Sequence, residues 1–475
     1  STRGPSSIAM PSHTDAIILG AGISGLTAGF YLAEQGFRVR ILEKSPRVGG
    51  SIRSERRDGF LIEFGPNTVL ESTPLLGELF DKLGIASERE NASPQAKNRY
   101  IVRGGQLHPL PTSALAFLKT PLFSTAAKFR LLLEPFISRA PADREESLAD
   151  FVTRRIGPEF LDYAINPFVA GVYAGDPAHL GVQSAFPKLH ALEREHGSLI
   201  KGAILGARQR KKSGETPKSR APMLGFQNGL QTLPDALHRA LGDSISTSCA
   251  IRQITRSDAG FSVALESGEI LEAPVLLSTV PAHTFSSLPM EFAQKLAATL
   301  DGITHPPVAM VFMGFDKPPG GIERDGFGFL VPAKENRQIL GCIWSSSIFQ
   351  GRTPAGGAGL TTFVGGSRQP DLARLNDSDL GALVLGELRA LMGVTATPSL
   401  VAVQKWEKAI PQYRVGYGET MEAISSFEND TPGFFVSGNF RGGIAVPDCV
   451  KQSRAIADRI SGFLSSRSVN TTQTQ

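Results

Sequence analysis

The sequence predicts an α/β fold in which glycine-rich turns join strands to helices near both ends of the chain. Near the N-terminus the apolar run Ala16–Leu19 leads into the turn Gly20–Gly25. Near the C-terminus the run Phe434–Gly438 leads, through two further glycines, into a helical pattern from about 446 to 460. Strand–turn–helix junctions of this kind are typical of doubly wound sheets. We therefore expect separated stretches of sequence to build one domain.

The first junction has the residue types and the spacing of a dinucleotide site. Gly20 permits a tight turn, Gly22 lets the backbone approach a pyrophosphate, and Gly25 lets the helix that begins near Ile23 pack against the strand. The next apolar run ends in an acid, Glu43, about 20 residues further on, where a ribose hydroxyl is expected. The series of strand, turn, helix, strand and acid favours nucleotide binding over an ordinary glycine-rich turn.

The rest of the chain alternates strand-rich and helical stretches. Strands are expected at Ser246–Ile254, Phe261–Leu265, Val275–Thr279, Val308–Phe315, Gly326–Val331, Ile339–Ser345 and Thr361–Gly366. Helical patterns separated by prolines are expected at Leu131–Ile137, Leu148–Ile156, Phe160–Ala164 and Ser198–Gly206. The middle of the chain therefore predicts an inserted helical domain, followed by a second strand-rich region.

Composition limits the classes of function. The 475 residues are 41% hydrophobic and 20% charged, as in globular proteins, and no apolar run is long enough to span a membrane. The net charge of +4 comes from the basic run 207–220, which we interpret as a flexible loop, so nucleic-acid binding is not expected. The three cysteines show no metal or redox spacing and indicate a reducing compartment. Residues 1–14 are interpreted as a leader or tag.

The sequence shows no side chains arranged for metal or nucleophilic catalysis. His190 and His196 flank Glu193 at spacings unlike those of a zinc helix, and no serine lies in a nucleophile-elbow pattern. A dinucleotide site without such residues indicates that the cofactor performs the difficult step. The helix N-terminus at Gly443–Val446 would then stabilise an anion on that cofactor. A purely structural strand–helix junction is the alternative.

Further motifs carry a resemblance to one family. Besides the glycine turn they are Arg47-Val48-Gly49-Gly50, Glu63-Phe64-Gly65-Pro66-Asn67-Thr68, Asn98-Arg99-Tyr100, Phe168-Val169-Ala170-Gly171, Gly326-Phe327-Gly328-Phe329-Leu330-Val331-Pro332, Thr362-Phe363-Val364-Gly365-Gly366-Ser367 and Gly438-Asn439-Phe440-Arg441-Gly442-Gly443. From about residue 15 to residue 462 the chain closely resembles the oxygen-dependent protoporphyrinogen oxidases. The first and last motifs are shared with amine oxidases and carotenoid desaturases, whereas the middle ones are specific to this family.

The resemblance implies three domains. These are a Rossmann-like FAD-binding domain of the p-hydroxybenzoate-hydroxylase type, an α+β substrate domain and an inserted helical membrane-binding domain. The corresponding ranges are 15–88, 236–282 and 425–465 for FAD binding, 89–110, 221–235 and 283–424 for substrate, and 111–206 for the helical domain. Within the last, Leu115–Phe123 and the basic Lys119, Lys128 and Arg130 suit a bilayer interface, and core packing is equally compatible with the sequence.

Carried over residue by residue, the resemblance implies an FAD site. The pyrophosphate would be lined by Gly20, Gly22, Ile23, Ser24 and Gly25, with Glu43 at the ribose and Ile251 over the adenine. The isoalloxazine side would be formed by Gly50, Ser51, Gly65, Pro66, Asn67 and Thr68. The flavin would be closed by Trp406, Gly443, Ile444, Ala445 and Val446. Arg441 departs from some relatives and is expected near the flavin edge, where it would affect the potential.

The same resemblance implies a substrate slot. Arg99 matches the arginine that holds a substrate propionate, and its fork suits a carboxylate in a way that lysine does not. Apolar walls would be formed by Phe327, Leu330, Ile343 and Phe363, with the backbone around Gly171 as the far wall. Such a slot suits a large apolar macrocycle with carboxylates at one edge. Without the resemblance, the apolar residues would be interpreted as core and Arg99 as a surface charge.

The resemblance implies a reaction that removes six electrons from protoporphyrinogen IX, in haem biosynthesis and with chlorophyll biosynthesis as a second setting. FAD would accept a hydride in each of three steps, and O2 would reoxidise it to give H2O2. Coproporphyrinogen III, with four carboxylates, is the nearest alternative substrate, and Arg99 is the one cation that can be placed. A flavin amine oxidase and a non-catalytic porphyrin or flavin carrier are the alternatives of another class. A cytoplasmic enzyme at a membrane surface is expected, with a homodimer and hand-off to ferrochelatase as further partner hypotheses.

Overall fold

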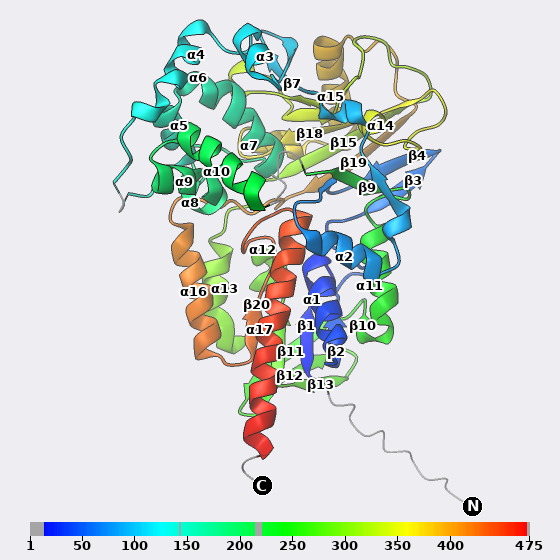
Figure 1. Ribbon diagram of the computed structural model, residues 1–475. Helices are drawn as coiled ribbons and strands as arrows, with labels where there is room; N and C mark the ends of the chain where they lie inside the picture. The colour runs from blue at the N-terminus through cyan, green and yellow to red at the C-terminus, as the bar shows by residue number, and fades with distance from the viewer. Residues whose placement is uncertain (1–13, 142–143, 214–220, 473–475) are drawn as a thin grey trace, which may run out of the picture.

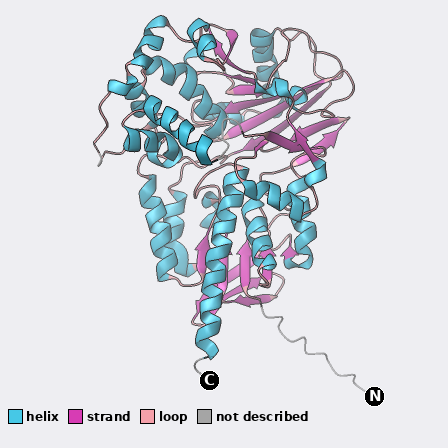
Figure 2. Ribbon diagram, in the orientation of Figure 1, coloured by secondary structure: helices cyan, strands magenta, loops and turns pink. Residues whose placement is uncertain are grey.

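The computed structural model describes residues 14–141, 144–213 and 221–472, which form two tiers (Figure 1). The lower tier holds a sheet wrapped by helices, and both ends of the chain leave from its base. The upper tier holds a larger sheet beside a group of helices, as the strands and helices of Figure 2 show. The predicted leader lies outside the described residues, except for Thr14.

A five-stranded parallel sheet forms the centre of the lower tier, in the order β10-β2-β1-β14-β20. Its strands are β1 Ala16–Leu19, β2 Val39–Leu42, β10 Ile245–Ser246, β14 Val275–Ser278 and β20 Phe434–Val436. Every residue of β1 is buried because both faces of the sheet are covered, which explains an apolar run without alternation. The carboxyl ends of all five strands meet at the edge that faces the upper tier (Figure 1).

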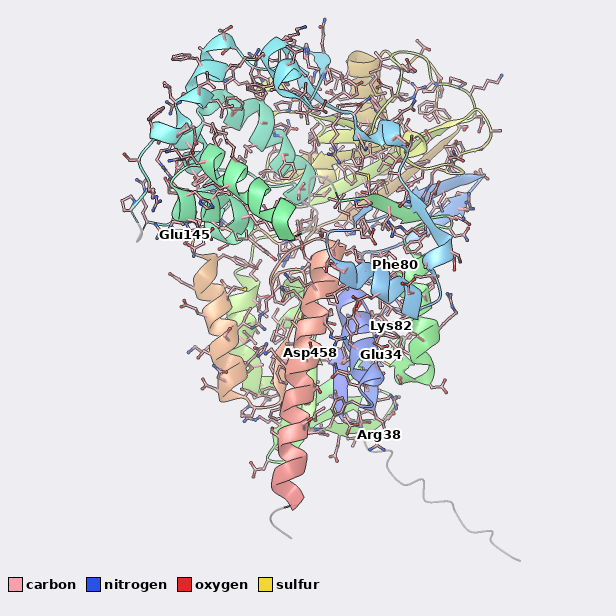
Figure 3. All side chains as sticks on the ribbon, viewed as in Figure 1. Glu34, Arg38, Phe80, Lys82, Glu145 and Asp458 are labelled. Carbon is pink, nitrogen blue, oxygen red and sulfur yellow. The ribbon has the colours of Figure 1, made fainter. Side chains whose placement is uncertain are left out.

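Helices cover one face of this sheet. They are α1 Ile23–Glu34, α2 Pro74–Lys82, α11 Thr232–Leu241 and α17 Val446–Thr472. Lys82 of α2 pairs with Glu34 of α1 at 2.6 Å, and Figure 3 labels both residues. The other face carries β11 Ile251–Ser257, β12 Gly260–Leu265, β13 Ile270–Ala273, α12 Ala282–Phe285, α13 Gln294–Asp301 and α16 Tyr417–Asp430. The result is a layered Rossmann-like arrangement.

The upper tier is built on a seven-stranded sheet in the order β19-β15-β18-β17-β16-β7-β8. Its strands are β7 Arg99–Arg103, β8 Gln106–Pro109, β15 Val308–Phe315, β16 Gly328–Leu330, β17 Gly341–Ile343, β18 Ala358–Gly365 and β19 Leu400–Trp406. α15, Asp377–Met392, packs on one face. In register, Leu330 lies opposite Gly341 and Gly341 opposite Phe363, so one row of side chains crosses the other face.

A group of helices, more numerous than the sequence predicted, lies beside this sheet. They are α3 Ala114–Lys119, α4 Thr125–Leu132, α5 Leu148–Arg155, α6 Pro158–Phe160, α7 Asn166–Tyr173, α8 Val182–Ala185, α9 Pro187–His196 and α10 Leu199–Ser213. A fully buried ion pair between Glu134 and Arg155 lies at their centre. Glu134 also accepts hydrogen bonds from the amides of Leu199 and Ile200, so it caps the start of α10.

Short strands link the two tiers. A hairpin joins β3 Ser54–Arg57 to β4 Phe60–Glu63, and a small sheet joins β5 Val69–Leu70, β9 Met223–Phe226 and β6 Arg89–Asn91. The short helix α14, Ser345–Ile348, follows β17. Strands β5 and β6 both pair with β9, and they lie on opposite sides of the domain boundary predicted between residues 88 and 89. This boundary therefore divides one small sheet.

Several predicted elements have different bounds. The strand expected at Ser246–Ile254 is two strands in different sheets, because the chain turns at Ser248, where φ is 54°. The helix expected at Leu131–Ile137 ends at Leu132, and a 3-10 turn follows that contains Pro135. The basic run was expected to be a loop, but α10 continues through 207–213, and 214–220 lies outside the described residues.

Candidate functional site

The glycine turn brings backbone against backbone at the carboxyl end of β1. Gly20 has φ +97°, a conformation that favours glycine. A Cβ on Gly25 would collide with the carbonyl oxygen of Gly20, so only glycine fits at that position. Gly22 is the N-cap of α1 and places no side-chain acceptor on the first amides of the helix. This cradle, which includes Ile23 and Ser24, therefore suits a phosphate.

Glu43 lies at the end of β2 against this turn. Its carboxylate accepts hydrogen bonds from the amide of Ala21 at 2.7 Å and from the amide of Ser45 at 2.8 Å. It is half-buried and keeps lone pairs that a hydroxyl can use. The amide of Cys249 donates to the carbonyl oxygen of Glu43 at 2.9 Å. The structure thus brings Glu43 close to the segment that leads into Ile251.

Arg47 holds the next loop beside the glycine turn. Its guanidinium donates to three carbonyl oxygens of its own loop, those of Val48, Gly50 and Ile52. Burial lowers the pKa of Arg47, but an arginine keeps its charge at neutral pH. The amide of Gly49 donates to the carbonyl oxygen of Ala21 at 2.8 Å, so the loop runs alongside the turn.

Gly65 and the residues after it lie against this loop. A Cβ on Gly65 would collide with the carbonyl oxygen of Ser51, and the Asn67 side chain donates to the carbonyl oxygen of Gly65 at 3.1 Å. The side chains of Pro66, Asn67 and Thr68 are half-buried. The structure therefore brings together the residues predicted for one side of a cofactor.

The N-terminus of α17 reaches the same edge of the lower sheet. It follows Gly442 and Gly443, which have φ +85° and +130°. The hydroxyl of Ser453 donates to the carbonyl oxygen of Ser24 at 2.9 Å, which fixes α17 on α1. Figure 1 shows α17 running from the boundary between the tiers down to the C-terminus. The loop Gly443–Val446 therefore lies at the end of the helix that faces the boundary.

Arg441 in this loop has a partner that the sequence did not reveal. Its guanidinium pairs with Glu428 of α16 at 2.6 Å and donates to the carbonyl oxygen of Val436 at 2.7 Å. Burial alone would raise the pKa of Glu428, but hydrogen bonds from Arg441 and Arg459 lower it overall. Glu428 therefore compensates part of the charge of Arg441, and the pair anchors the loop to α16. The expected effect of Arg441 on the flavin potential stays a prediction.

Apolar side chains line the face of the upper sheet opposite α15. Four of the predicted wall residues are half-buried, namely Phe327, Leu330, Ile343 and Phe363. Phe329, next to Leu330, points the other way and is buried in the cluster under α15. Gly328, with φ +139°, interrupts the alternation of the strand, so Phe327 packs in the same cluster as Ile343.

Helix α7 lies over this face. A Cβ on Gly171 would lie 2.6 Å from Cδ2 of Leu330, so helix and sheet approach closely at this glycine. Ala170 belongs to an apolar cluster against which both Phe363 and Trp406 pack. Trp406 lies on β19 opposite Val308. The structure thus brings Trp406 together with the predicted substrate wall.

Arg99 begins β7 at the edge of the apolar face, opposite Gly328. Its guanidinium carbon lies 5.4 Å from the centre of the Phe327 ring. Among the described residues no carboxylate pairs with it. Its side chain is exposed, but partial burial of the guanidinium lowers the pKa of Arg99. A cation without an acid partner therefore lies beside aromatic and aliphatic walls.

Two buried tyrosines beside the α17 loop were missed by sequence reasoning. The hydroxyl of Tyr413 donates to the carbonyl oxygen of Asn439 at 2.7 Å and accepts from the amide of Gly443 at 3.0 Å. The hydroxyl of Tyr417 donates to the carbonyl oxygen of Phe440 at 2.6 Å. The tyrosines lie far from the loop in sequence, and no motif marks them.

Comparison with known proteins decides the family. Residues 23–461 match the flavin containing amine oxidoreductases. The chain belongs to this family. It is therefore an FAD-dependent oxidoreductase with a flavin amine oxidase-type α/β fold, and the predicted cofactor and fold class are confirmed at that level. The glycine cradle, in which a Cβ has no room at Gly25, fits this cofactor.

Relatives with curated names cover nearly the whole chain. Protoporphyrinogen oxidase 2, chloroplastic/mitochondrial, of Arabidopsis thaliana is 34% identical over 94% of this chain and 94% of its own. Coproporphyrinogen III oxidase of Bacillus subtilis (strain 168) is 28% identical over 94% of this chain and 98% of its own. A solved structure from Exiguobacterium sp. 255-15 has a TM-score of 0.80 at 24% identity, covering 95% of this chain and 99% of that one, and shares the fold of this family member.

Three further observations concern the described residues outside this site. No group of His, Cys, Asp and Glu among them is arranged to hold a metal ion. No helix in the described part of the chain is long and apolar enough to cross a bilayer. A depression of about 320 Å³ that includes His179, Thr304 and Arg414 contains none of the predicted site residues.

Proposed function

We propose that this family member oxidises a porphyrinogen with FAD and O2, releases H2O2, and prefers protoporphyrinogen IX. The observation that carries the proposal is Arg99, a partly desolvated cation without an acid partner among the described residues, at the rim of an apolar face. A reduced tetrapyrrole with propionates has the complementary chemistry. The names of the relatives, protoporphyrinogen oxidase above all, support the same substrate class.

The chain's own residues hold the two reactants. The pyrophosphate would rest on the cradle from Gly20 to Gly25, the ribose on Glu43 and the adenine under Ile251. The flavin ring would lie between the Gly50–Ser51 and Gly65–Thr68 stretches and the loop Gly443–Val446. When bound, FAD supplies hydride acceptance and reoxidation by O2. The proposal assigns no side-chain base.

The walls of the slot would orient the macrocycle. Phe327, Leu330, Ile343 and Phe363 offer apolar surface on the sheet, and α7 packs directly on Leu330 at Gly171, which bounds the slot there. A flat ring system held against this surface would be shielded from water, while Arg99 would bind one acid side chain in bidentate fashion. The arginine thus sets which edge of the ring lies at the rim.

Coproporphyrinogen III is the second candidate, favoured by the Bacillus subtilis relative. Its four carboxylates would call for more cations at the slot. Arg368 is a second arginine near α7, but its guanidinium already donates to the carbonyl oxygen of Val331 at 2.8 Å and to Asn166 Oδ1 at 3.0 Å. Because these contacts engage Arg368, the protein's preference should be for the substrate with fewer acids.

Turnover of the two porphyrinogens side by side tests the substrate. Porphyrin fluorescence follows each reaction at equal enzyme concentration. We expect a higher kcat/KM with protoporphyrinogen IX than with coproporphyrinogen III. A higher kcat/KM with coproporphyrinogen III would make the tetracarboxylate the preferred substrate. If neither substrate yields porphyrin, the proposal is overturned.

We further propose that the helical group docks on a membrane. An apolar patch on α3, α4 and the turn after α4 supports this, and its members are Leu115, Leu118, Phe129, Leu132 and Phe136, each more than 60% exposed. Leu122 and Phe123, which were expected to share this role, are buried in a core cluster instead. We also propose the domain limits given in the sequence analysis and a cytoplasmic location. A homodimer and hand-off of the product to ferrochelatase are further proposals.

A further inference from the structure

The segment between β19 and α16 holds the loop that leads into α17. Through its hydroxyl, Tyr413 bonds both the amide of Gly443 and the carbonyl oxygen of Asn439. Tyr417, four residues further on at the start of α16, donates a hydrogen bond to the carbonyl oxygen of Phe440. Two phenols therefore fix three backbone positions within five residues of the loop.

The two rings have little freedom of their own. Their planes are stacked, with centroids 4.5 Å apart and 17° between them, and the ring of Tyr173 meets Tyr413 edge-on at 6.2 Å. Tyr413 and Tyr417 are 4% and 6% exposed. Burial raises the pKa of both phenols, so both keep their protons at neutral pH and remain hydrogen-bond donors.

The loop before α17 needs contacts from other segments to hold one conformation, because its glycines have little conformational preference of their own. Gly442 and Gly443 both adopt positive φ, and glycine backbones have the greatest conformational freedom. The amide of Gly443 lies three residues before the first residue of α17. A change in its orientation would alter where the positive end of that helix points.

The supporting segment is itself tied to the upper tier. The amide of Gly181 donates to the carbonyl oxygen of Tyr413 at 2.9 Å, and the Gln412 side chain donates to the carbonyl oxygen of Tyr173, at the end of α7, at 2.8 Å. Glu145, labelled in Figure 3, accepts a hydrogen bond from the amide of Gly416 at 2.8 Å. The backbone around Tyr413 is thus hydrogen-bonded to the upper tier, while its hydroxyl is hydrogen-bonded to the glycine loop.

We propose that Tyr413 is a positioning residue that holds the Gly443 amide, and with it the N-terminus of α17, against the flavin. The inference rests on the proposed placement of the flavin beside Gly443–Val446. A fixed helix N-terminus favours negative charge on the reduced flavin, so the tyrosine acts on affinity and potential through the loop. Tyr417 contacts the loop at Phe440, further from α17, and provides a matched comparison.

The test compares Tyr413→Phe with Tyr417→Phe, since each variant keeps its ring and loses one hydroxyl. The readouts are release of FAD from the purified holoprotein and the midpoint potential of the bound flavin. Tyr413→Phe is expected to bind FAD about three- to tenfold more weakly and to have a more negative potential. Tyr417→Phe is expected to keep the wild-type potential. Equal changes in both variants, or no change in Tyr413→Phe, would overturn the inference.

A second measurement needs no variant. Hydrogen–deuterium exchange at the Gly443 amide of the wild-type holoprotein should be slow, because the amide is bonded to a buried hydroxyl. Exchange at the rate of an exposed amide would overturn the role of Tyr413. If wild type holds FAD and produces porphyrin while Tyr413→Phe behaves identically, only this inference fails. If wild type holds no FAD, the proposed function fails with it.

Discussion

The role of Arg99 is indicated by its surroundings in the structure and not by its residue type. In the sequence it is one of 49 basic residues, and without the family resemblance it would be interpreted as a surface charge. In the structure its guanidinium lies over Phe327 with no acid among the described residues to pair with it. Most other arginines of the described chain that approach apolar surface, such as Arg103 with Glu159, have a carboxylate partner. The Arg99 guanidinium is therefore available to pair with a carboxylate of a bound molecule.

Replacing Arg99 tests this reading. Arg99→Ala should weaken porphyrinogen binding by about 2 kcal/mol, the lower end of the cost of breaking a desolvated charge pair, because the side chain is partly exposed. The effect should appear in KM, while FAD content stays at the wild-type level. Arg99→Lys should recover only part of the loss, since a point charge cannot reproduce the bidentate fork. Unchanged Michaelis behaviour in Arg99→Ala would remove the residue from the site.

Other site residues could be predicted to different degrees. The glycine positions follow from backbone geometry, and the collision at Gly25 gives the physical reason for the residue type. The tyrosines could not be predicted, because their partners are carbonyl and amide groups that any sequence carries. Arg441 was placed in the right loop, but its partner Glu428 lies on a different helix and leaves no signature in the sequence.

At the scale of elements, the helical group is organised around charge as well as apolar packing. Glu134 accepts hydrogen bonds from Arg155, from the Ser198 hydroxyl and from two amides at the start of α10. Burial alone would raise the pKa of Glu134, but these hydrogen bonds outweigh it and the pKa is lowered overall. The folded state thus prefers the ionised carboxylate more strongly than the unfolded chain does.

The stability of this group should depend on pH in a defined direction. Because the folded pKa of Glu134 is lowered, its contribution is present above the unfolded value of about 4.3 and is lost as pH falls through the folded value. Glu134→Ala should cost about 3 kcal/mol, the lower end for breaking a buried ion pair, since Arg155 loses its nearer carboxylate and keeps Glu193 at 3.3 Å. Denaturant unfolding measures both effects. Asp162→Asn, which removes an exposed pair with Lys334, should change little, and an equal loss would contradict the account.

The elements themselves were predicted unevenly for physical reasons. The strand predicted at Val308–Phe315 was correct to the residue. A strand that is buried on both faces needs apolar side chains at every position, so a continuous apolar run marks it clearly. The strand expected at Ser246–Ile254 was wrong because a positive φ at Ser248 redirects the chain without a glycine to signal it. α3, α7 and α9 were missed, since a proline stands at or near the start of each and indicates a break in the sequence pattern.

At the scale of the whole molecule, the two helices that carry most of the apolar patch, α3 and α4, lie at the end opposite to both termini (Figure 1). Phe129 and Leu132 are three residues apart on α4 and share one face, Phe136 follows in the 3-10 turn after α4, and Leu115 and Leu118 lie on α3. Phe136 is 83% exposed. Monomeric soluble proteins rarely leave such large groups together in water.

Charge introduced into the patch should release the protein from lipid. Leu118→Asp with Phe136→Asp should abolish co-flotation with liposomes that contain anionic lipid, because burying two carboxylates in the interface is costly. Ile270→Asp is the matched control, since Ile270 is 60% exposed on β13 of the lower tier. Wild-type protein that stays with the unbound fraction, or a control as impaired as the double variant, would contradict the membrane proposal.

The N-termini of α1 and α17 lie at the boundary between the two tiers (Figure 1). We therefore expect FAD and a porphyrinogen to react across this boundary. Anaerobic addition of protoporphyrinogen IX to the purified holoprotein tests it most directly. We expect the flavin absorbance to bleach as porphyrin fluorescence rises, and H2O2 to form when air is admitted. A flavin spectrum that stays unchanged under substrate, or a protein that remains colourless when supplied with FAD, would contradict the account.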